Sequence, residues 1–174
     1  MKDMYKQDWN SSCENSPRCD TYTSFKQTFE MEKYIKDLNV NKFVYALARL
    51  RTGASELKIN RMHTQPQPDM GCPFCNKVEN ELHFLKECPT YTHLRNKYLS
   101  PFYKHEQITN LDHFFNTEDR TTIRNLAQYV FHAMTLRKQE IAWLKSRNKY
   151  LLTHNQQDKQ TQTDIHTDQD EIAT

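Results

Sequence analysis

Hydrophobic side chains recur at intervals of three and four residues in several segments of this chain, which is the pattern of helices that bury one face. The pattern predicts helices over residues 25–38, 40–52, 89–99, 111–115 and 121–145. Gly53 follows the second of these helices, where a C-terminal cap is commonly a glycine. Pro101 ends the third helix, and residues 54–71 are expected to be an extended connection. The hydrophobic pattern therefore predicts a small all-α fold.

Polar segments without helical periodicity flank the predicted helices. Residues 1–24 are rich in Ser, Asn and Asp, and we expect them to form a flexible N-terminal extension. From Asn148 onward Gln, Thr, Asp and Asn dominate, so residues 148–174 cannot build a core and are predicted to be a disordered polar tail. The predicted folded domain therefore spans residues 25–147.

Composition limits what the folded part can be. Hydrophobic residues make up 36% of the chain, which limits the core, so a bound metal would help to fix the fold. Residues 148–174 carry two lysines against five acidic residues, a net charge of −3. Because the whole chain has a net charge of +2, the remaining residues carry +5. A basic domain with an acidic tail is compatible with nucleic-acid binding. No apolar run approaches the roughly 18 residues of a membrane-spanning helix, so we expect no membrane partner.

Three cysteines and a histidine lie within seventeen residues at the spacing C-x2-C-x7-H-x4-C: Cys72, Cys75, His83 and Cys88. A closed set of three thiolates and one imidazole is a usual structural solution for a tetrahedral Zn²⁺ ion. Asn76, directly after the second cysteine, tolerates the left-handed backbone conformation that a tight metal knuckle often needs. The spacing therefore predicts one structural zinc ion.

The interval between His83 and Cys88 has its own explanation. Residues 79–86 are predicted to form a short helix, and five residues along a continuous α-helix would place two side chains roughly 140° apart. Pro89 disfavours helical geometry at the residue before it. We therefore expect Cys88 to leave the helix and turn back toward His83.

Two questions about the ligands stay open at this point. His93 could replace His83 as the fourth ligand, and His63 is a more distant candidate. Cys13 and Cys19 complete the five cysteines, but their spacing indicates no site. An odd cysteine number and the absence of an apolar N-terminal stretch predict a reducing, intracellular environment, whether nuclear or cytoplasmic.

The sequence lacks the catalytic motifs of several common enzyme classes. It contains no adjacent aspartates on a strand to hold catalytic magnesium, and no GxSxG, Walker or HExxH motif. The chain has only two glycines, which argues against a glycine-rich phosphate loop. A catalytic zinc needs an open coordination position, whereas a complete Cys3His set leaves none. We therefore expect no catalysis by this chain.

Several runs of residues together resemble a known family. They are 47–53 (LARLRTG), 72–75 (CPFC), 81–91 (ELHFLKECPTY) and Arg95. This order resembles the zinc-binding C-terminal region that follows the polymerase domain in reverse transcriptases of non-LTR (LINE-like) retrotransposons. The similarity covers roughly residues 25–145, and the motif around the cysteines is its most specific part. Ala54 stands where many relatives have histidine, and Asn76 where many have glycine.

The resemblance implies a fragment that binds nucleic acid and lacks the polymerase domain. Such a region would help the parent polymerase, a partner within the same polyprotein, to bind template RNA or target DNA through non-specific phosphate contacts. We expect the basic residues around the motif to make these contacts: Arg49, Arg51, Arg61, Lys77, Lys86, Arg95 and Lys97. The alternative is a zinc-stabilised helical domain for protein interaction or scaffolding, which the amphipathic 121–145 helix favours.

Overall fold

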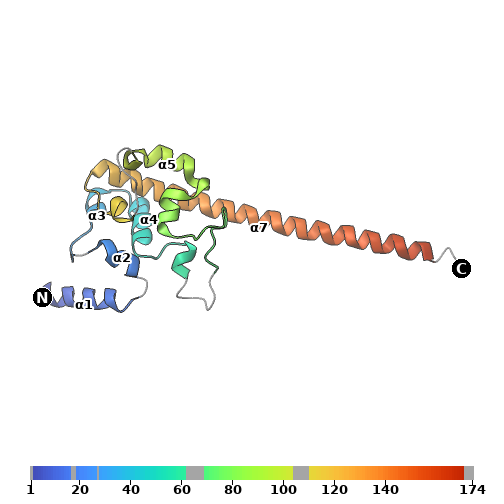
Figure 1. Ribbon diagram of the computed structural model, residues 1–174, viewed down its shortest axis with the longest axis horizontal. Coiled ribbons are helices and arrows are strands. Elements are labelled where there is room, and N and C mark those ends of the chain that lie inside the picture. Colours follow the sequence, from blue (N-terminus) through green and yellow to red (C-terminus); the bar gives the residue numbers. More distant parts are fainter. Residues whose placement is uncertain (1, 17–18, 27, 62–68, 104–109, 171–174) are drawn as a thin grey trace. The chain divides into compact units, whose positions relative to one another are not determined.

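The structure is a computed structural model that describes the backbone of residues 2–16, 19–26, 28–61, 69–103 and 110–170 (Figure 1). Side chains are described in the same ranges except at residues 2, 20, 21, 61 and 151–170. The chain divides into two compact units, Met1–Thr135 and Leu136–Thr174. Helices make up 71% of the structure, and the described residues contain no strand. The predicted all-α fold with a Cys3His cluster is confirmed.

The regular elements are α-helices and single turns of 3-10 or π helix. In chain order they are α1 (Lys2–Glu14), α2 (Asp20–Phe25), α3 (Lys33–Asp37), α4 (Asn41–Arg51), a 3-10 turn (Lys58–Arg61), a π-helical turn (His83–Glu87), a 3-10 turn (Pro89–Tyr91), α5 (Thr92–Tyr98), a 3-10 turn (Ser100–Tyr103), α6 (Asp112–Phe115) and α7 (Arg120–Asp170). Three predicted helices, 40–52, 89–99 and 111–115, lie within a few residues of observed ones.

Helix α4 ends with the cap that the sequence predicts. Gly53 has a φ of 64°, in the left-handed region that glycine adopts without a Cβ clash. Its N–H donates to the Leu50 carbonyl at 3.4 Å, and the Ala54 N–H donates to the Arg49 carbonyl at 2.9 Å. These two bonds form a Schellman motif, which satisfies the last carbonyl groups of the helix.

The N-terminal segment, whose polar composition predicts a flexible extension, is helical in the structure. It forms α1 and α2, and the ring of Trp9 on α1 lies 6.5 Å from Tyr22 and 5.8 Å from Phe29. These aromatic contacts join residues far apart along the chain, so periodicity within residues 1–24 could not reveal them. The domain boundary at residue 25 stays a prediction, with helical residues on both sides of it.

The predicted helix over residues 25–38 is wrong. Helix α2 ends at Phe25, and only Lys33–Asp37 is helical in the segment that follows. The reason is that Phe25 and Tyr34 are both buried against one partner, since their rings lie 4.6 and 5.3 Å from the Arg51 guanidinium. The chain turns between the two rings to bring both of them to Arg51.

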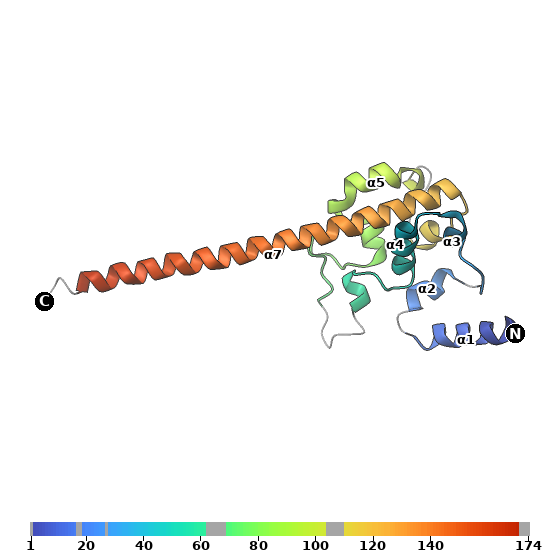
Figure 2. The same cartoon turned by 180° about the vertical axis from the view of Figure 1, so that it is seen from behind.

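The first turns of α7 pack between α4 and α5 in the first unit (Figures 1 and 2). Phe131 of α7 lies 5.4 Å from Phe43 of α4, and His132 lies 5.6 Å from Tyr98 of α5. The buried side chains of these turns recur at helical spacing and are Ile123, Leu126, Ala127, Tyr129, Val130 and Ala133. The hydrophobic stripe of this helix is therefore core, as its pattern indicates.

The backbone of α7 continues past the predicted end near Lys145, as far as Asp170. No glycine or proline occurs after Pro101, so no residue in this segment interrupts the helical hydrogen bonds. The disordered polar tail stays a prediction, because the side chains of residues 151–170 lie outside the described ones. Among the described helices, none is apolar over a length that would cross a membrane.

Candidate metal centre

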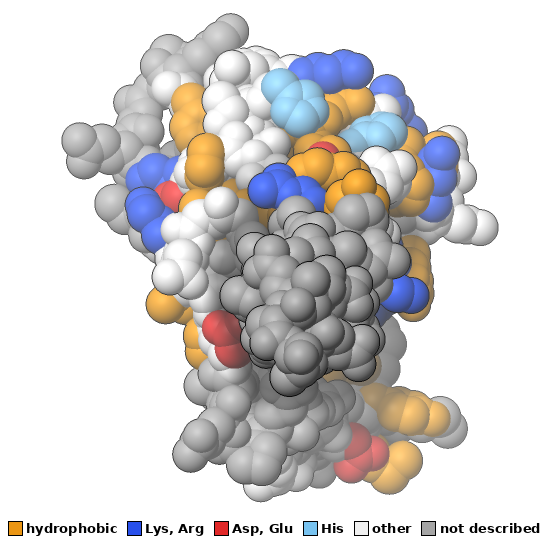
Figure 3. All heavy atoms as spheres, turned by 90° about the vertical axis from the view of Figure 1, so that its right-hand side faces the viewer, with side chains coloured by type: hydrophobic (Ala, Val, Ile, Leu, Met, Phe, Trp, Pro, Cys, Tyr) orange, Lys and Arg blue, Asp and Glu red, His pale blue; other side chains and the backbone are white. Residues whose placement is uncertain are grey.

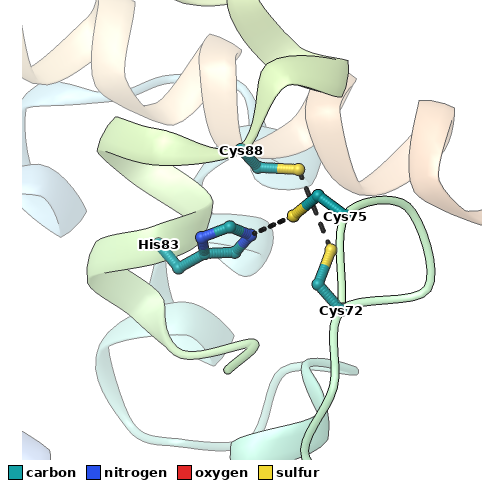
Figure 4. A group of neighbouring side chains, drawn as sticks. All are labelled: Cys72, Cys75, His83 and Cys88. Carbon is teal, nitrogen blue, oxygen red and sulfur yellow. Dashed lines mark hydrogen bonds between the residues drawn. The ribbon is translucent and has the colours of Figure 1, made fainter. Parts of the chain in front are cut away.

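The three cysteines and the histidine of the motif converge on one point (Figure 4). Their four ligand atoms all lie within 4.8 Å of one another. The Sγ atoms of Cys72 and Cys88 are 3.8 Å apart, and the Sγ of Cys75 is 3.3 Å from Nε2 of His83. Cys72, His83 and Cys88 are buried and Cys75 is half-buried. These four residues can hold one metal ion.

A tight turn presents the first two cysteines. Asn76 has a φ of 60°, as expected for a knuckle, and its N–H donates to the Cys72 carbonyl at 2.9 Å. Gly71 pairs with Val78 in an isolated antiparallel bridge, and the Cys72 N–H donates to the Lys77 carbonyl at 2.6 Å. A Cβ at Gly71 would lie 2.9 Å from Oδ1 of Asn76, the end of a side chain that can rotate, and 3.8 Å from the Asn76 carbonyl, so the turn does not depend on glycine there.

A π-helical turn presents the other two ligands. The Cys88 N–H donates to the His83 carbonyl at 2.9 Å, five residues back. Cys88 itself has a ψ of 122°, the extended conformation that Pro89 was predicted to impose. The wider turn and the extended residue bring both side chains to one side, whereas five residues of α-helix would separate them by roughly 140°. Single π turns are frequent at functional sites.

The imidazole of His83 is oriented from both of its nitrogen atoms. Nε2 faces Cys75, while Nδ1 lies 3.5 Å from Oε2 of Glu87, one turn along. A carboxylate beside the second nitrogen of a ligating histidine fixes the ring and its tautomer. His93 is exposed and lies outside the cluster, so His83 is the histidine of this site. His63, the other alternative, lies outside the described residues.

The thiols of Cys72 and Cys88 have opposite pKa shifts. The Cys88 contact raises the pKa of the Cys72 thiol to about 12, and the same contact lowers the pKa of the Cys88 thiol to about 7. The shifts are opposite because the two sulfur atoms share one proton. Backbone N–H groups of Phe74 and Cys75 at the first sulfur, and of Thr90 at the second, act to lower these pKa values. A cation that replaced the shared proton would meet two thiolates already supplied with N–H donors.

The π turn is anchored in the core of the first unit. Phe84, between the ligands, is fully buried, and its ring lies 5.0 Å from Tyr91 and 5.6 Å from Tyr129. The Tyr129 hydroxyl donates to the Phe84 carbonyl at 2.6 Å, and the Tyr103 hydroxyl donates to the Leu85 carbonyl at 3.1 Å. These bonds satisfy carbonyl groups that the π turn leaves free, so α7 helps to hold the ligands in place.

Arg51, one of the predicted nucleic-acid contacts, is buried with an exposed fraction of 3%. Its guanidinium donates to the Phe115 carbonyl at 2.8 Å and to Oε2 of Glu32 at 2.9 Å. The rings of Phe25, Tyr34 and Phe115 lie 4.6, 5.3 and 5.0 Å from it. We call these five residues the Arg51 cluster; here the arginine is part of the core.

Arg95, another of the predicted contacts, is 7% exposed and donates to the Thr92 hydroxyl at 2.9 Å. The remaining predicted contacts differ in exposure, with Lys77 and Lys97 exposed and Arg49 and Lys86 half-buried. The side chain of Arg61 lies outside the described residues.

Cys13 and Cys19, which the sequence could not explain, lie apart from the metal set. Burial, together with the neighbouring Cys19, raises the pKa of the Cys13 thiol. Neither belongs to the cluster of four ligands.

Comparison with protein-family models, with curated proteins and with solved structures gives no match to this chain.

Proposed function

We propose that the four ligands bind one Zn²⁺ ion whose role is structural. The convergence of Cys72, Cys75, His83 and Cys88 carries this proposal. A tetrahedral zinc with Zn–S bonds of about 2.3 Å requires sulfur atoms roughly 3.8 Å apart. The Cys72–Cys88 separation of 3.8 Å already fits that geometry. Thiolate-rich tetrahedral sites favour zinc over magnesium or calcium, which take oxygen ligands.

The composition of the site supports a structural ion over a catalytic one. Four protein ligands complete a tetrahedral shell and leave no position for water or substrate. Two of the sulfur ligands and the imidazole are buried, which further restricts access. Zinc supplies folding free energy in such sites, because the unfolded chain does not present the ligands together. We therefore propose that the chain performs no catalysis.

We further propose that the zinc-stabilised domain binds RNA or DNA. The order of the RTG, CPFC and HFLKECP motifs supports this through its resemblance to the C-terminal region of non-LTR retrotransposon reverse transcriptases. Exposed lysines such as Lys77 and Lys97 are able to contact phosphates without sequence preference. In a parent polyprotein, the adjoining polymerase domain would be the other partner.

Two measurements test the proposal in turn. Native mass spectrometry of the purified chain is expected to give one zinc per chain, and a folded, metal-free chain would contradict the metal assignment. Fluorescence anisotropy with labelled single-stranded RNA, single-stranded DNA and duplex DNA is then expected to show micromolar binding that weakens steeply as salt rises. Failure to bind any of the three at low salt would contradict the nucleic-acid assignment while leaving the zinc site intact.

The alternative function is a protein-interaction domain that zinc only stabilises. On α7, Trp143 and Tyr150 are large side chains with exposed fractions of 55% and 59%, and such residues are common at protein interfaces. Light scattering after size-exclusion chromatography distinguishes the two functions. A stable dimer without nucleic-acid binding would favour the alternative, especially if Trp143→Ala made the chain monomeric.

A further inference from the structure

The exposed side of α4 combines cations with an aromatic ring. Lys42, Tyr45 and Arg49 stand at intervals of three and four residues, which places them on one face of the helix. Tyr45 has an exposed fraction of 64%, and the Arg49 guanidinium lies 5.6 Å from its ring. Leu47 and Leu50 occupy the buried face of the same helix. Tyr45 is therefore a large aromatic side chain that the core does not use.

Cationic and aromatic side chains also lie next to one another on α7 and α5. The Lys42 ammonium lies 5.0 Å from the Phe131 ring, and that ring lies 5.3 Å from His132. The imidazole of His132 stacks on Tyr98 with a 5.6 Å separation and a 6° angle between the planes. The Lys97 ammonium in turn lies 5.0 Å from the Tyr98 ring. Three helices thus bring two lysines, 55 positions apart in sequence, to the same set of aromatic rings.

The two lysines are not neutralised by neighbouring acids. Within the described part of the chain, neither Lys42 nor Lys97 has a carboxylate at ion-pair distance, whereas Lys26 pairs with Glu32 and Lys33 pairs with Asp37. Burial, together with the charges of Lys97 and Lys42, lowers the pKa of His132. Both ammonium groups therefore act electrostatically on the imidazole. The local potential is positive, and an anion is the complementary ligand.

We propose that these residues form a binding surface for single-stranded nucleic acid, which rests on the nucleic-acid binding proposed above. We call it the basic–aromatic surface, formed by Lys42, Tyr45, Arg49, Lys97, Tyr98 and His132. The cations contact backbone phosphates, and Tyr45 stacks on an unpaired base. Single-strand binding proteins combine the same two elements, a positive track and exposed aromatic faces. A duplex keeps its bases stacked and would use only the cations.

The space-filling view shows the same combination of side-chain types. In Figure 3, histidine side chains lie among Lys or Arg and hydrophobic side chains in the upper part of the view. Acidic side chains are sparse in that part of the face shown. The basic–aromatic surface differs from the nucleic-acid contacts predicted from sequence. Arg51 and Arg95 of the predicted contacts are buried, and Lys42, Tyr45 and His132 were not among them.

The test compares two double variants with the same loss of charge. Lys42→Ala with Lys97→Ala removes the lysines of the surface, and Lys33→Ala with Lys36→Ala removes two exposed lysines of α3. Binding of a labelled single-stranded 20-mer is measured by anisotropy over a range of salt concentrations, using zinc-loaded full-length chain. Two lost phosphate contacts on a single strand are expected to reduce the slope of log Kd against log salt by about 1.4. The control is expected to keep the wild-type slope.

A third variant tests the stacking. Tyr45→Ala removes an exposed side chain, and we expect binding to the single strand to weaken about fivefold, at the low end for loss of one stacked base. Binding to duplex DNA is expected not to change. Zinc content and circular dichroism check that every variant folds like the wild type.

The outcomes separate this inference from the function on which it rests. Wild-type binding with equal slopes for the two double variants would overturn the basic–aromatic surface and leave nucleic-acid binding intact. A reduced slope in which Tyr45→Ala has no effect, with duplex bound as tightly as single strand, would overturn the single-strand assignment. No binding by the wild-type chain would overturn the proposed function together with this surface.

Discussion

The candidate metal site and the Arg51 cluster both lie in the first unit, but they are built from residues at very different sequence distances. The four metal ligands come from residues 72–88, whereas the Arg51 cluster joins Phe25, Glu32 and Tyr34 to Phe115. The ligands have a spacing that chemistry restricts, while the cluster depends on the path of the whole chain. Interactions between residues close together in the sequence can be predicted from it, whereas interactions between distant residues are seen only in the folded structure.

Loss of a metal ligand is expected to have the largest effect. Cys88→Ser removes a buried ligand, and zinc content is expected to fall from one per chain to near zero. Because zinc binding in comparable sites is worth about 10–16 kcal/mol, we expect the π turn and the knuckle to unfold with it. Native mass spectrometry and near-ultraviolet circular dichroism measure the two effects.

The matched control for this variant is Cys19→Ser, which removes a thiol that lies outside the cluster. It is expected to keep one zinc per chain. Equal zinc loss in the two variants, or full zinc retention by Cys88→Ser, would contradict the assignment of ligands.

Breaking the Arg51 cluster is expected to have the second largest effect. Arg51→Met removes the cation between three rings, leaves Glu32 with only Lys26 as an ion-pair partner, and removes the donor to the Phe115 carbonyl. Removing one member of a buried ion pair costs about 3 kcal/mol or more. We expect urea unfolding of the zinc-loaded chain to show that loss while the zinc content stays at one per chain.

Arg124→Met is the matched control, because Arg124 is exposed on α7. Its effect on the free energy of unfolding is expected to stay within about 0.5 kcal/mol. If Arg51→Met were equally mild and instead weakened nucleic-acid binding, the original assignment of Arg51 as a phosphate contact would be right.

A smaller effect is expected where α7 meets the π turn. Tyr129→Phe removes the hydroxyl that donates to the Phe84 carbonyl at 2.6 Å and leaves that carbonyl buried. An unsatisfied buried acceptor costs about 1–3 kcal/mol. We expect urea unfolding to show this loss, with zinc retained. A simultaneous loss of zinc would mean that α7, rather than the local sequence, determines the position of the ligands.

The smallest effect is expected beside His83. Glu87→Gln removes the charge 3.5 Å from Nδ1 but keeps a hydrogen-bond acceptor. Since this carboxylate is 42% exposed, we expect zinc affinity to fall by at most about tenfold, the lower end for partners of metal ligands. Competition with a chromogenic chelator measures the affinity. A loss approaching that of Cys88→Ser would make Glu87 a ligand instead of a support.

The success and failure of the sequence predictions follow from the same difference. The ligand set, the left-handed Asn76 and the extended Cys88 were predictable, because each depends on residues a few positions away. The π-helical turn was not, since its hydrogen bond replaces a helical one that the same residues could form. The burial of Arg51 was not predictable either, because its Phe115 partner lies 64 residues away. The sequence shows that Arg51 carries a positive charge, but only the fold shows that its side chain is buried.

X-ray absorption at the zinc edge, on the purified full-length chain, tests the central claim most directly. The account predicts a first shell of three sulfur atoms at about 2.3 Å and one nitrogen atom at about 2.0 Å. His83→Gln should then lose the nitrogen contribution, while His93→Gln should keep it. A shell dominated by nitrogen or oxygen, or a folded chain without zinc, would contradict the claim.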